Sequence, residues 1–158
     1  MEKTMRITLR ELDASDATNI VEWRSRPEVY KYFKSPHAIT RKEHMDWYNN
    51  YYLKDNNRFD YMLIMKETKE PLGVFGIKYL PDAESVEISY LIKRDAQGKG
   101  YAKEAVQLLI SIAQEKWNCK KIVAEIHKDN VASIRFIKKQ NFVLEKQHQD
   151  FILFGRNI

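Results

Sequence analysis

Residues 97–102 read QGKGYA, and this glycine-rich turn joins a strand-like run to a long amphipathic segment. The run before it, Glu84–Ile92 (ESVEISYLI), alternates polar with apolar or aromatic residues, which predicts a half-buried strand. The segment after it, Tyr101–Trp117, places its apolar residues on one face at helical spacing. The turn is therefore expected at a helix N-terminus, where free backbone N–H groups and the helix dipole favour an anion such as phosphate.

The spacing of these glycines differs from that of two common phosphate-binding motifs. A P-loop ends in Gly-Lys-Ser/Thr, and a dinucleotide fingerprint has a third glycine. The turn resembles instead the acetyl-CoA pyrophosphate loop of GNAT-superfamily N-acetyltransferases, Gln/Arg-x-x-Gly-x-Gly/Ala, with Gln97, Gly100 and Ala102 at the three specified positions. The alternative is a turn that only makes a tight connection.

A second stretch, Asn130–Phe142, resembles the segment Asn-x-x-Ser/Ala-Ile-x-x-x-x-Lys-x-Gly-Phe of the same family. In that family the asparagine contacts the CoA arm, and the helix that follows packs beside the cofactor. Asp129 or Asn130 is expected to cap this helix, and Asn141 replaces the usual glycine at its end, where asparagine tolerates the left-handed conformation. Many members carry a tyrosine seven residues after the asparagine, thought to protonate the leaving thiolate, but this chain has Ile137 there.

The resemblance implies acetyl-CoA as the co-substrate of an N-acetyltransferase. The residues that it places at the cofactor are Leu91, Ile92, Lys93, Gln97, Gly98, Lys99, Gly100, Tyr101, Ala102, Asn130, Ser133 and Phe136. It also implies that backbone N–H groups near Leu91–Lys93 stabilise the oxyanion of the tetrahedral intermediate.

Acetyl transfer to an amine requires a neutral amine and a proton for the departing thiolate. Deprotonating a lysine-like amine at pH 7 costs about 4.6 kcal/mol, whereas an α-amino group costs about 1 kcal/mol. Glu87 is the candidate base, because the family often has an acidic residue on this strand; a solvated strand residue is the alternative, with Glu84 in reserve. Ser133 is the candidate acid, unless its hydroxyl only bonds backbone, and Tyr90 is a possible substitute.

The acceptor site is expected in the N-terminal third, between Trp23 and Tyr48. This region resembles acetyltransferases that modify an amino-sugar nucleotide on the pseudaminic-acid route, with the pattern E-W-R-N-x-P-E-V-R and H-x-I-S-x-E-E-H-x-x-W-F. The substrate-binding candidates are Arg24, Tyr30, His37 and Trp47. Arg24, Arg26 and Lys31, with the aromatic residues of this region, suit a nucleotide diphosphate and its base. Aromatic residues at helical spacing are also typical of core packing. The alternatives are a ribosomal-protein-like N-terminal acetyltransferase, suggested by the loop and the missing tyrosine, and a catalytically degenerate CoA-binding domain.

The composition fits one ordered domain, 1–158, with a formal net charge of +5, 44% hydrophobic and 31% charged residues. The Lys and Arg residues are spread along the chain, which argues against nucleic-acid binding. No apolar run is long enough to span a membrane and no signal-peptide pattern begins the chain, so a cytoplasmic protein is expected. The single cysteine, Cys119, excludes an internal disulfide and is expected to pack, and the histidines lack metal-ligand spacing, so no metal is predicted.

The order of expected elements is β, α, α, β, β, β, α, β, α, β, β, which gives an α/β (α+β layered) domain. The strands are expected at Arg6–Leu12, Phe59–Lys66, Leu72–Leu80, Glu84–Ile92, Lys121–His127, Phe142–Lys146 and Phe151–Gly155. The resemblance adds a mixed, mostly antiparallel sheet with helices on both faces and a V-shaped splay between strands 4 and 5. Phe151–Ile158 is expected to leave little room for a full last strand, and Phe151 and Phe154 to pair across subunits in a homodimer.

Overall fold

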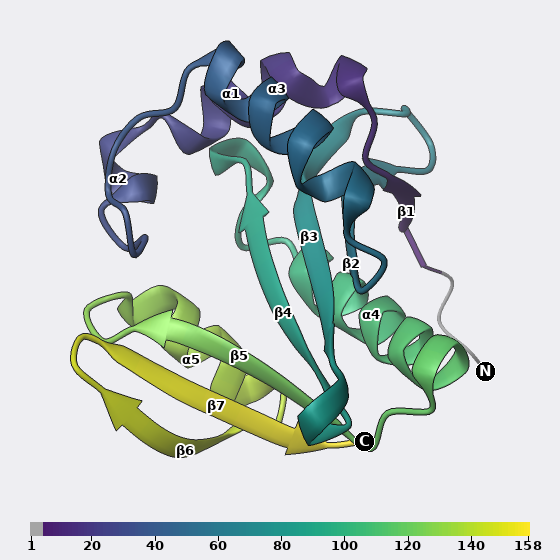
Figure 1. Ribbon diagram of the computed structural model, residues 1–158, viewed down its shortest axis with the longest axis vertical. Coiled ribbons are helices and arrows are strands. Elements are labelled where there is room, and N and C mark those ends of the chain that lie inside the picture. Colours follow the sequence, from purple (N-terminus) through teal and green to yellow (C-terminus); the bar gives the residue numbers. More distant parts are fainter. Residues whose placement is uncertain (1–4) are drawn as a thin grey trace.

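A twisted seven-stranded sheet forms the centre of the molecule (Figure 1). The structure is a computed structural model that describes residues 5–158, and its strands lie in the order β1-β2-β3-β4-β5-β7-β6. Their bounds are β1 Ile7–Glu11, β2 Arg58–Met65, β3 Pro71–Leu80, β4 Ser85–Ile92, β5 Lys121–His127, β6 Val143–His148 and β7 Phe151–Asn157. Within these residues β4 and β5 are parallel and the other neighbouring pairs antiparallel, which confirms the mixed, mostly antiparallel sheet.

The strands β4 and β5 pair over only part of their length. Their ladder joins Ser85–Ile88 to Lys121–Ala124, whereas β4 continues to Ile92 and β5 to His127. Beyond the ladder the strands diverge, and Figure 1 shows the V between them, open on the side of α2 and α5. The expected splay is therefore confirmed, and it leaves the end of β4 free to contact a ligand.

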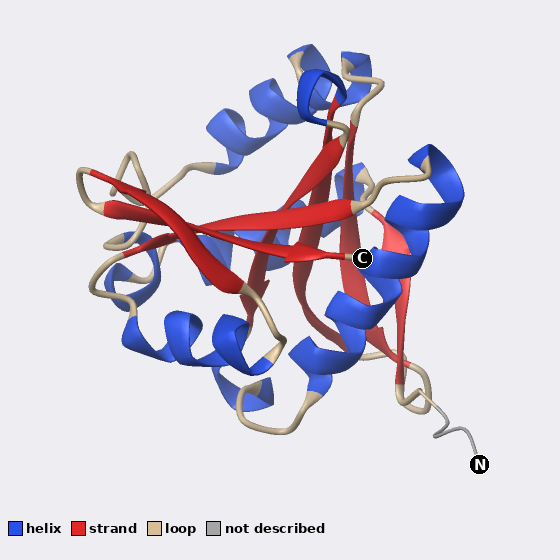
Figure 2. Cartoon of the chain, turned by 90° about the horizontal axis from the view of Figure 1, so that it is seen from below, coloured by secondary structure: helices blue, strands red, loops and turns tan. Residues whose placement is uncertain are grey.

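Helices cover both faces of the sheet, as Figures 1 and 2 show. One face carries α4 (Tyr101–Trp117) and α5 (Val131–Lys139), and the other carries α1 (Ala17–Arg24), α2 (Pro27–Tyr30) and α3 (Arg41–Asn50). Because successive strand residues point to opposite faces, Leu63 packs in the cluster that contains Leu109 of α4, and its neighbour Met62 packs with Ile20 of α1. The sheet thus separates two apolar clusters.

Capping side chains mark the start of α3 and of α5. The Thr40 hydroxyl accepts the Glu43 N–H at 3.1 Å, and the Glu43 carboxylate accepts the Thr40 N–H at 3.1 Å, which forms a capping box. Asp13 caps a 3₁₀ turn rather than the helix itself, so α1 begins only at Ala17. The Asn130 side chain caps the start of α5. After the end of α5, Asn141 has a φ of 67°, the left-handed conformation expected there.

The last strand is longer than the sequence indicated. All seven residues of β7 pair with β5, from Phe151 opposite His127 to Asn157 opposite Lys121, because β5 offers an edge of matching length. The expected contact of Phe154 with a second subunit is also wrong, since its side chain is fully buried (0% exposed) in the main core. Phe151 is half-buried and packs edge-on against the His127 ring, with centroids 5.2 Å apart.

Candidate active site

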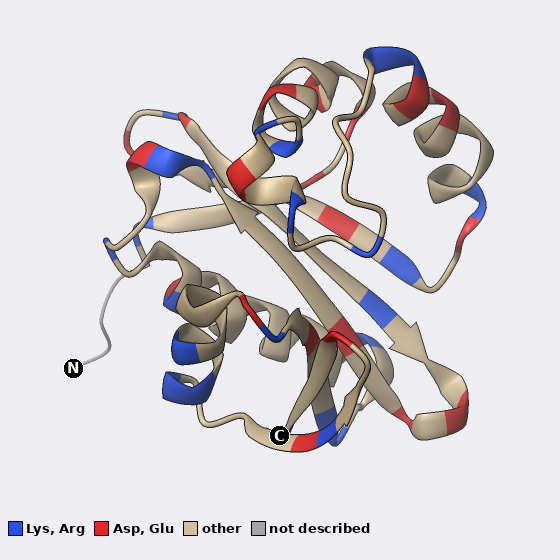
Figure 3. Cartoon of the chain, turned by 90° about the vertical axis from the view of Figure 1, so that its left-hand side faces the viewer, with Lys and Arg blue, Asp and Glu red and all other residues tan. Residues whose placement is uncertain are grey.

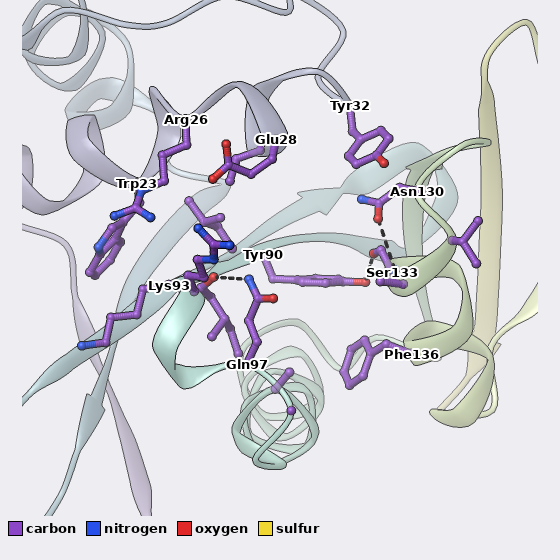
Figure 4. A pocket seen from close by; sticks show the side chains of 18 of the residues that line it. Trp23, Arg26, Glu28, Tyr32, Tyr90, Lys93, Gln97, Asn130, Ser133 and Phe136 are labelled. Atoms are coloured by element: carbon purple, nitrogen blue, oxygen red, sulfur yellow. Dashed lines mark hydrogen bonds between the residues drawn. The ribbon is translucent and has the colours of Figure 1, made fainter.

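A pocket of about 960 Å³ lies at the splay between β4 and β5. It is lined by the end of β4, the turn that leads to α4, the first turn of α5, and the segment from α1 to α2, as Figure 4 shows in close view. Most of the expected cofactor residues line it, namely Leu91, Ile92, Lys93, Gln97, Gly98, Ala102, Asn130, Ser133 and Phe136. Lys99, Gly100 and Tyr101 belong to the same loop but are not part of the lining.

The glycine loop has the backbone that its sequence requires. Gly98 and Gly100 have φ values of +75° and +85°, a region that costs a residue with a side chain about 1–2 kcal/mol. Gly100 precedes the first residue of α4, so the loop presents the positive end of a helix of 17 residues. The Gln97 side-chain amide donates to the Ile92 carbonyl at 3.0 Å, which ties the loop to the end of β4 (Figure 4). This arrangement suits a phosphate group.

Arg6 holds the loop from the side of β1. Its Nη2 donates to the Lys99 carbonyl at 2.8 Å, and its guanidinium lies 4.6 Å from the centroid of the Tyr101 ring. Its backbone N–H and its Nε each donate to a carboxylate oxygen of Glu104 at 2.7 Å. Sequence reasoning missed Arg6, because no local pattern connects it with a loop more than 90 residues away.

The first turn of α5 brings two hydroxyl groups together. The Asn130 side-chain oxygen accepts the Ser133 N–H at 3.3 Å, and the Ser133 Oγ lies 2.6 Å from the Tyr90 hydroxyl of β4 (Figure 4). Burial raises the pKa of Tyr90 to about 12, although the hydrogen bond to Ser133 opposes the shift. Ile137, at the position of the family tyrosine, is fully buried (0% exposed).

Two features of β4 bear on the expected oxyanion site and base. The Lys93 N–H donates to the Leu72 carbonyl at 2.9 Å, so this N–H is already paired. Glu87 is half-buried at the end of the β4–β5 ladder, opposite Val123. Burial and the nearby Glu125 raise the pKa of Glu87, against the opposing effect of Lys34. Glu84 is exposed and precedes β4 at the end away from the splay.

The four expected substrate residues do not line the pocket. The Arg24 guanidinium lies 5.0 Å from the centroid of the Phe33 ring. The Trp47 ring packs against Tyr52, with centroids 5.2 Å apart. His37 is exposed and Tyr30 half-buried. The lining on this side comes instead from Trp23, Arg26, Glu28, Val29 and Tyr32. Of the basic residues expected to bind a nucleotide diphosphate, Arg26 lines the pocket and Arg24 and Lys31 do not, because α1 ends at Arg24 and Pro27 starts a new helix.

Comparison with known proteins agrees with this geometry. The model of the acetyltransferase (GNAT) domain family matches residues 6–143. The chain belongs to the GNAT acetyltransferase family. The uncharacterized N-acetyltransferase p20 of Bacillus licheniformis is 32% identical over 153 residues, covering 94% of this chain and 85% of that protein. The uncharacterized N-acetyltransferase YnaD of Bacillus subtilis is 27% identical, covering 86% of this chain and 78% of that protein.

Solved structures share the GNAT fold. The spermidine N-acetyltransferase of Vibrio cholerae, in complex with CoA and spermine, superposes with a TM-score of 0.84 at 20% identity, covering 96% of this chain and 95% of that one. The ribosomal L7/L12 N-acetyltransferase RimL, in complex with CoA, gives a TM-score of 0.82 at 18% identity, covering 98% and 96%.

This GNAT domain is therefore an N-acetyltransferase that uses acetyl-CoA, as the two sequence motifs implied.

Within residues 5–158, no three His, Cys, Asp or Glu side chains form a group that could hold a metal ion. None of the helices in that range has the length and apolar character needed to cross a membrane. Figure 3 shows the positions of Lys and Arg interspersed with those of Asp and Glu along the chain.

Proposed function

We propose that this GNAT acetyltransferase transfers the acetyl group of acetyl-CoA to the primary amine of an amino-sugar nucleotide, directly within a ternary complex. The observation that carries this proposal is the composition of the pocket wall between α1 and the segment after α2. There, Arg26 shares the lining with Tyr32, which is half-buried, and with Trp23, which is 6% exposed because it packs mainly in the core (Figure 4). A guanidinium suits a diphosphate, and aromatic rings suit a nucleotide base.

Arg26 is available for a ligand phosphate. Its ion pair with Glu22 is long, 3.6 Å, and both side chains are substantially exposed, at 40% for Arg26 and 61% for Glu22. Such an exposed pair contributes little to stability, so a phosphate can replace Glu22 at small cost. The guanidinium can then make two parallel hydrogen bonds to phosphate oxygens.

Both substrates are proposed to bind in the one pocket at the splay. The glycine loop takes the pyrophosphate of CoA, and the splay takes its pantetheine arm. The amino sugar then approaches the thioester from the side of Trp23 and Tyr32. Glu87 is half-buried on β4 and is not part of the pocket lining, so it is proposed to remove the amine proton through water; its raised pKa makes it a better base than an exposed carboxylate.

The charge of the lining helps to separate the possible acceptors. The lining contains two acidic residues, Glu28 and Asp129, and three basic ones, Arg26, Lys93 and Arg94. A polyamine is a polycation and would be favoured by an excess of carboxylates, which this lining does not have. Of the basic residues, Lys93 and Arg94 belong to the turn before the glycine loop and Lys93 pairs with Glu70, so Arg26 is the one that favours a nucleotide diphosphate.

The test is a panel of amines assayed for CoA thiol release, containing a UDP-amino sugar, a short peptide with a free N-terminus, and spermidine. Among these amines, the UDP-amino sugar is expected to have the highest kcat/KM. Acetylation of the peptide but not of the sugar would overturn the choice of acceptor. Binding of acetyl-CoA by calorimetry without turnover on any amine would instead indicate a degenerate domain.

A matched pair of variants locates the nucleotide site. Arg26→Ala is expected to raise the KM for the UDP-amino sugar about tenfold or more, because it removes a charge-assisted contact worth about 1.5–3 kcal/mol. Arg41→Ala removes an exposed arginine of α3 whose contact is the Thr18 hydroxyl, and it serves as the control. Equal KM values for the two variants would contradict a phosphate contact at Arg26.

A further inference from the structure

The splay of the sheet places a tyrosine of β4 against a serine of α5 at the pocket wall. The two hydroxyl oxygens of Tyr90 and Ser133 are 2.6 Å apart, the normal distance of an O–H···O hydrogen bond. Both residues line the pocket, and Figure 4 shows the Tyr90 hydroxyl directed at Ser133. The residues are 43 positions apart in the chain, so their contact depends on the fold.

Both hydroxyl groups are held in place. The Tyr90 ring stacks on Phe75, with centroids 5.6 Å apart and planes at 17°, and it meets Phe136 edge-on at 5.5 Å. Ser133 is fixed by the bond from its N–H to Asn130, which caps α5. Two aromatic neighbours and a helix cap therefore restrict the pair to one arrangement.

The hydroxyl pair lies where it can replace the proton donor that Ile137 does not provide. The buried Ile137 side chain has no proton to give, so the leaving thiolate needs another donor. We propose that Tyr90 and Ser133 act as one proton relay to the sulfur of CoA, with Ser133 next to the sulfur and Tyr90 behind it as a positioning and proton-supplying residue. This proposal rests on the acetyl-transfer function of the site but not on the identity of the acceptor.

The relay delivers one proton to the sulfur of CoA while the acetyl group moves to the amine. The amine nitrogen forms a bond to the acetyl carbon, and the carbon–sulfur bond breaks with its electron pair going to sulfur. Sulfur takes the Ser133 proton, Ser133 takes the Tyr90 proton, and Tyr90 regains a proton from water. The proton of the acetylated nitrogen leaves to the base or to water.

Two properties of the surroundings suit this role. Burial keeps the Tyr90 phenol protonated at neutral pH, so that it carries a proton when the thiolate departs. Ser133 lies in the first turn of α5, where the positive end of the helix dipole favours developing negative charge on sulfur.

The first test is a double-mutant cycle of Tyr90→Phe, Ser133→Ala and the double variant. Each single change is expected to lower kcat by about 100-fold or more, and the double variant by about the same factor, because the two groups act as a unit. The Kd for acetyl-CoA, measured by calorimetry, should stay within about twofold. Tyr79→Phe, which removes a hydroxyl from a ring stacked on Trp117, is the control. Wild-type kcat in Tyr90→Phe, or losses matched by weaker acetyl-CoA binding, would overturn the relay.

The second test needs no acceptor and so separates this proposal from the proposed function. Hydroxyl donors at the sulfur stabilise a thiolate, so CoA bound to the wild type should have a lower thiol pKa than CoA bound to the double variant. The pKa is read from the rate of iodoacetamide alkylation of the bound CoA as a function of pH. The wild type and the double variant have the same charged side chains in the lining, so these do not cause a difference in thiol pKa. They are Arg26, Glu28, Lys93, Arg94 and Asp129. An equal thiol pKa in both complexes would contradict the proposal even if acetyl transfer is established.

Discussion

Arg6 and Glu104 connect the start of β1 to the first turn of α4. The Glu104 carboxylate is nearly buried, at 10% exposure, and it accepts hydrogen bonds from both the backbone and the side chain of Arg6. The same guanidinium also donates to the carbonyl of Lys99 at 2.8 Å. One arginine therefore fixes both the helix that begins at the cofactor loop and the loop itself.

Arg6→Ala should weaken acetyl-CoA binding without affecting the chemical step. The loop loses the contact that fixes the Lys99 carbonyl, so its N–H groups no longer hold one arrangement for a phosphate. We expect the KM for acetyl-CoA to rise about five- to tenfold while kcat changes less than about twofold, as steady-state kinetics would show. Arg10→Ala is the matched control, since Arg10 lies on β1, which begins directly after Arg6, and pairs with the buried Asp16, away from the loop. A normal KM for acetyl-CoA in Arg6→Ala would remove Arg6 from the cofactor site.

Gly98→Ala and Gly100→Ala should have different effects. Both introduce a side chain at positive φ, which costs about 1–2 kcal/mol of stability. A Cβ at Gly98 meets no heavy atom within 4 Å and lies on the pocket wall, so it would obstruct the cofactor. A Cβ at Gly100 would approach Arg6 Nη2 at 3.1 Å. We therefore expect Gly98→Ala to weaken acetyl-CoA binding more and Gly100→Ala to lower the melting temperature more, measured by calorimetry and thermal unfolding. The reverse order would contradict the placement of the loop.

The acid limb of the pH–rate profile should follow Glu87. A base works when deprotonated, and burial together with Glu125 raises the pKa of Glu87, so kcat should fall as the pH drops through this raised value. Glu87→Gln should remove that limb and lower kcat by about 100-fold. Glu125→Gln is the sharper control: it removes a repelling charge and frees Lys34 from its 2.5 Å ion pair, so the limb should move to lower pH. A wild-type profile in Glu87→Gln would make Glu87 a solvated strand residue.

His44 should make the protein less stable in acid. It is 3% exposed, and its Nε2 has no hydrogen-bond partner among the described residues. Burial, followed by Arg24 and Arg41, lowers the pKa of His44 in the folded state. The unfolded chain therefore binds the proton first as the pH falls below about 6.5, and stability drops by up to about 1.4 kcal/mol per pH unit until the folded pKa is reached. Urea unfolding at pH 7.5 and pH 5.5 should show a smaller difference in His44→Phe than in the wild type, with His37→Gln as the control. An unchanged difference in His44→Phe would contradict this account.

Local patterns predicted most of the fold, because strand alternation and helix caps act over a few residues. The strand expected at Glu84–Ile92 and the helix from Tyr101 both followed from patterns of neighbouring residues in the sequence. The full length of β7 did not, because it depends on the edge that β5 offers.

The site was predictable in part for the same reason. The glycine loop is contiguous and has a recognisable spacing, whereas the Tyr90–Ser133 contact joins residues from two elements on opposite sides of the splay. On the acceptor side the sequence indicated both Arg24 and Arg26 for a diphosphate. Which of them lines the pocket depends on where α1 ends, and a local pattern did not decide that.

The most direct test of the account is the mass spectrum of the nucleotide recovered after incubation of a UDP-amino sugar with acetyl-CoA and the wild-type protein. The expected product is the nucleotide sugar with one acetyl group added to its amine, formed in an amount equal to the CoA released. An unmodified nucleotide sugar, with CoA released only when a peptide amine is added, would contradict it.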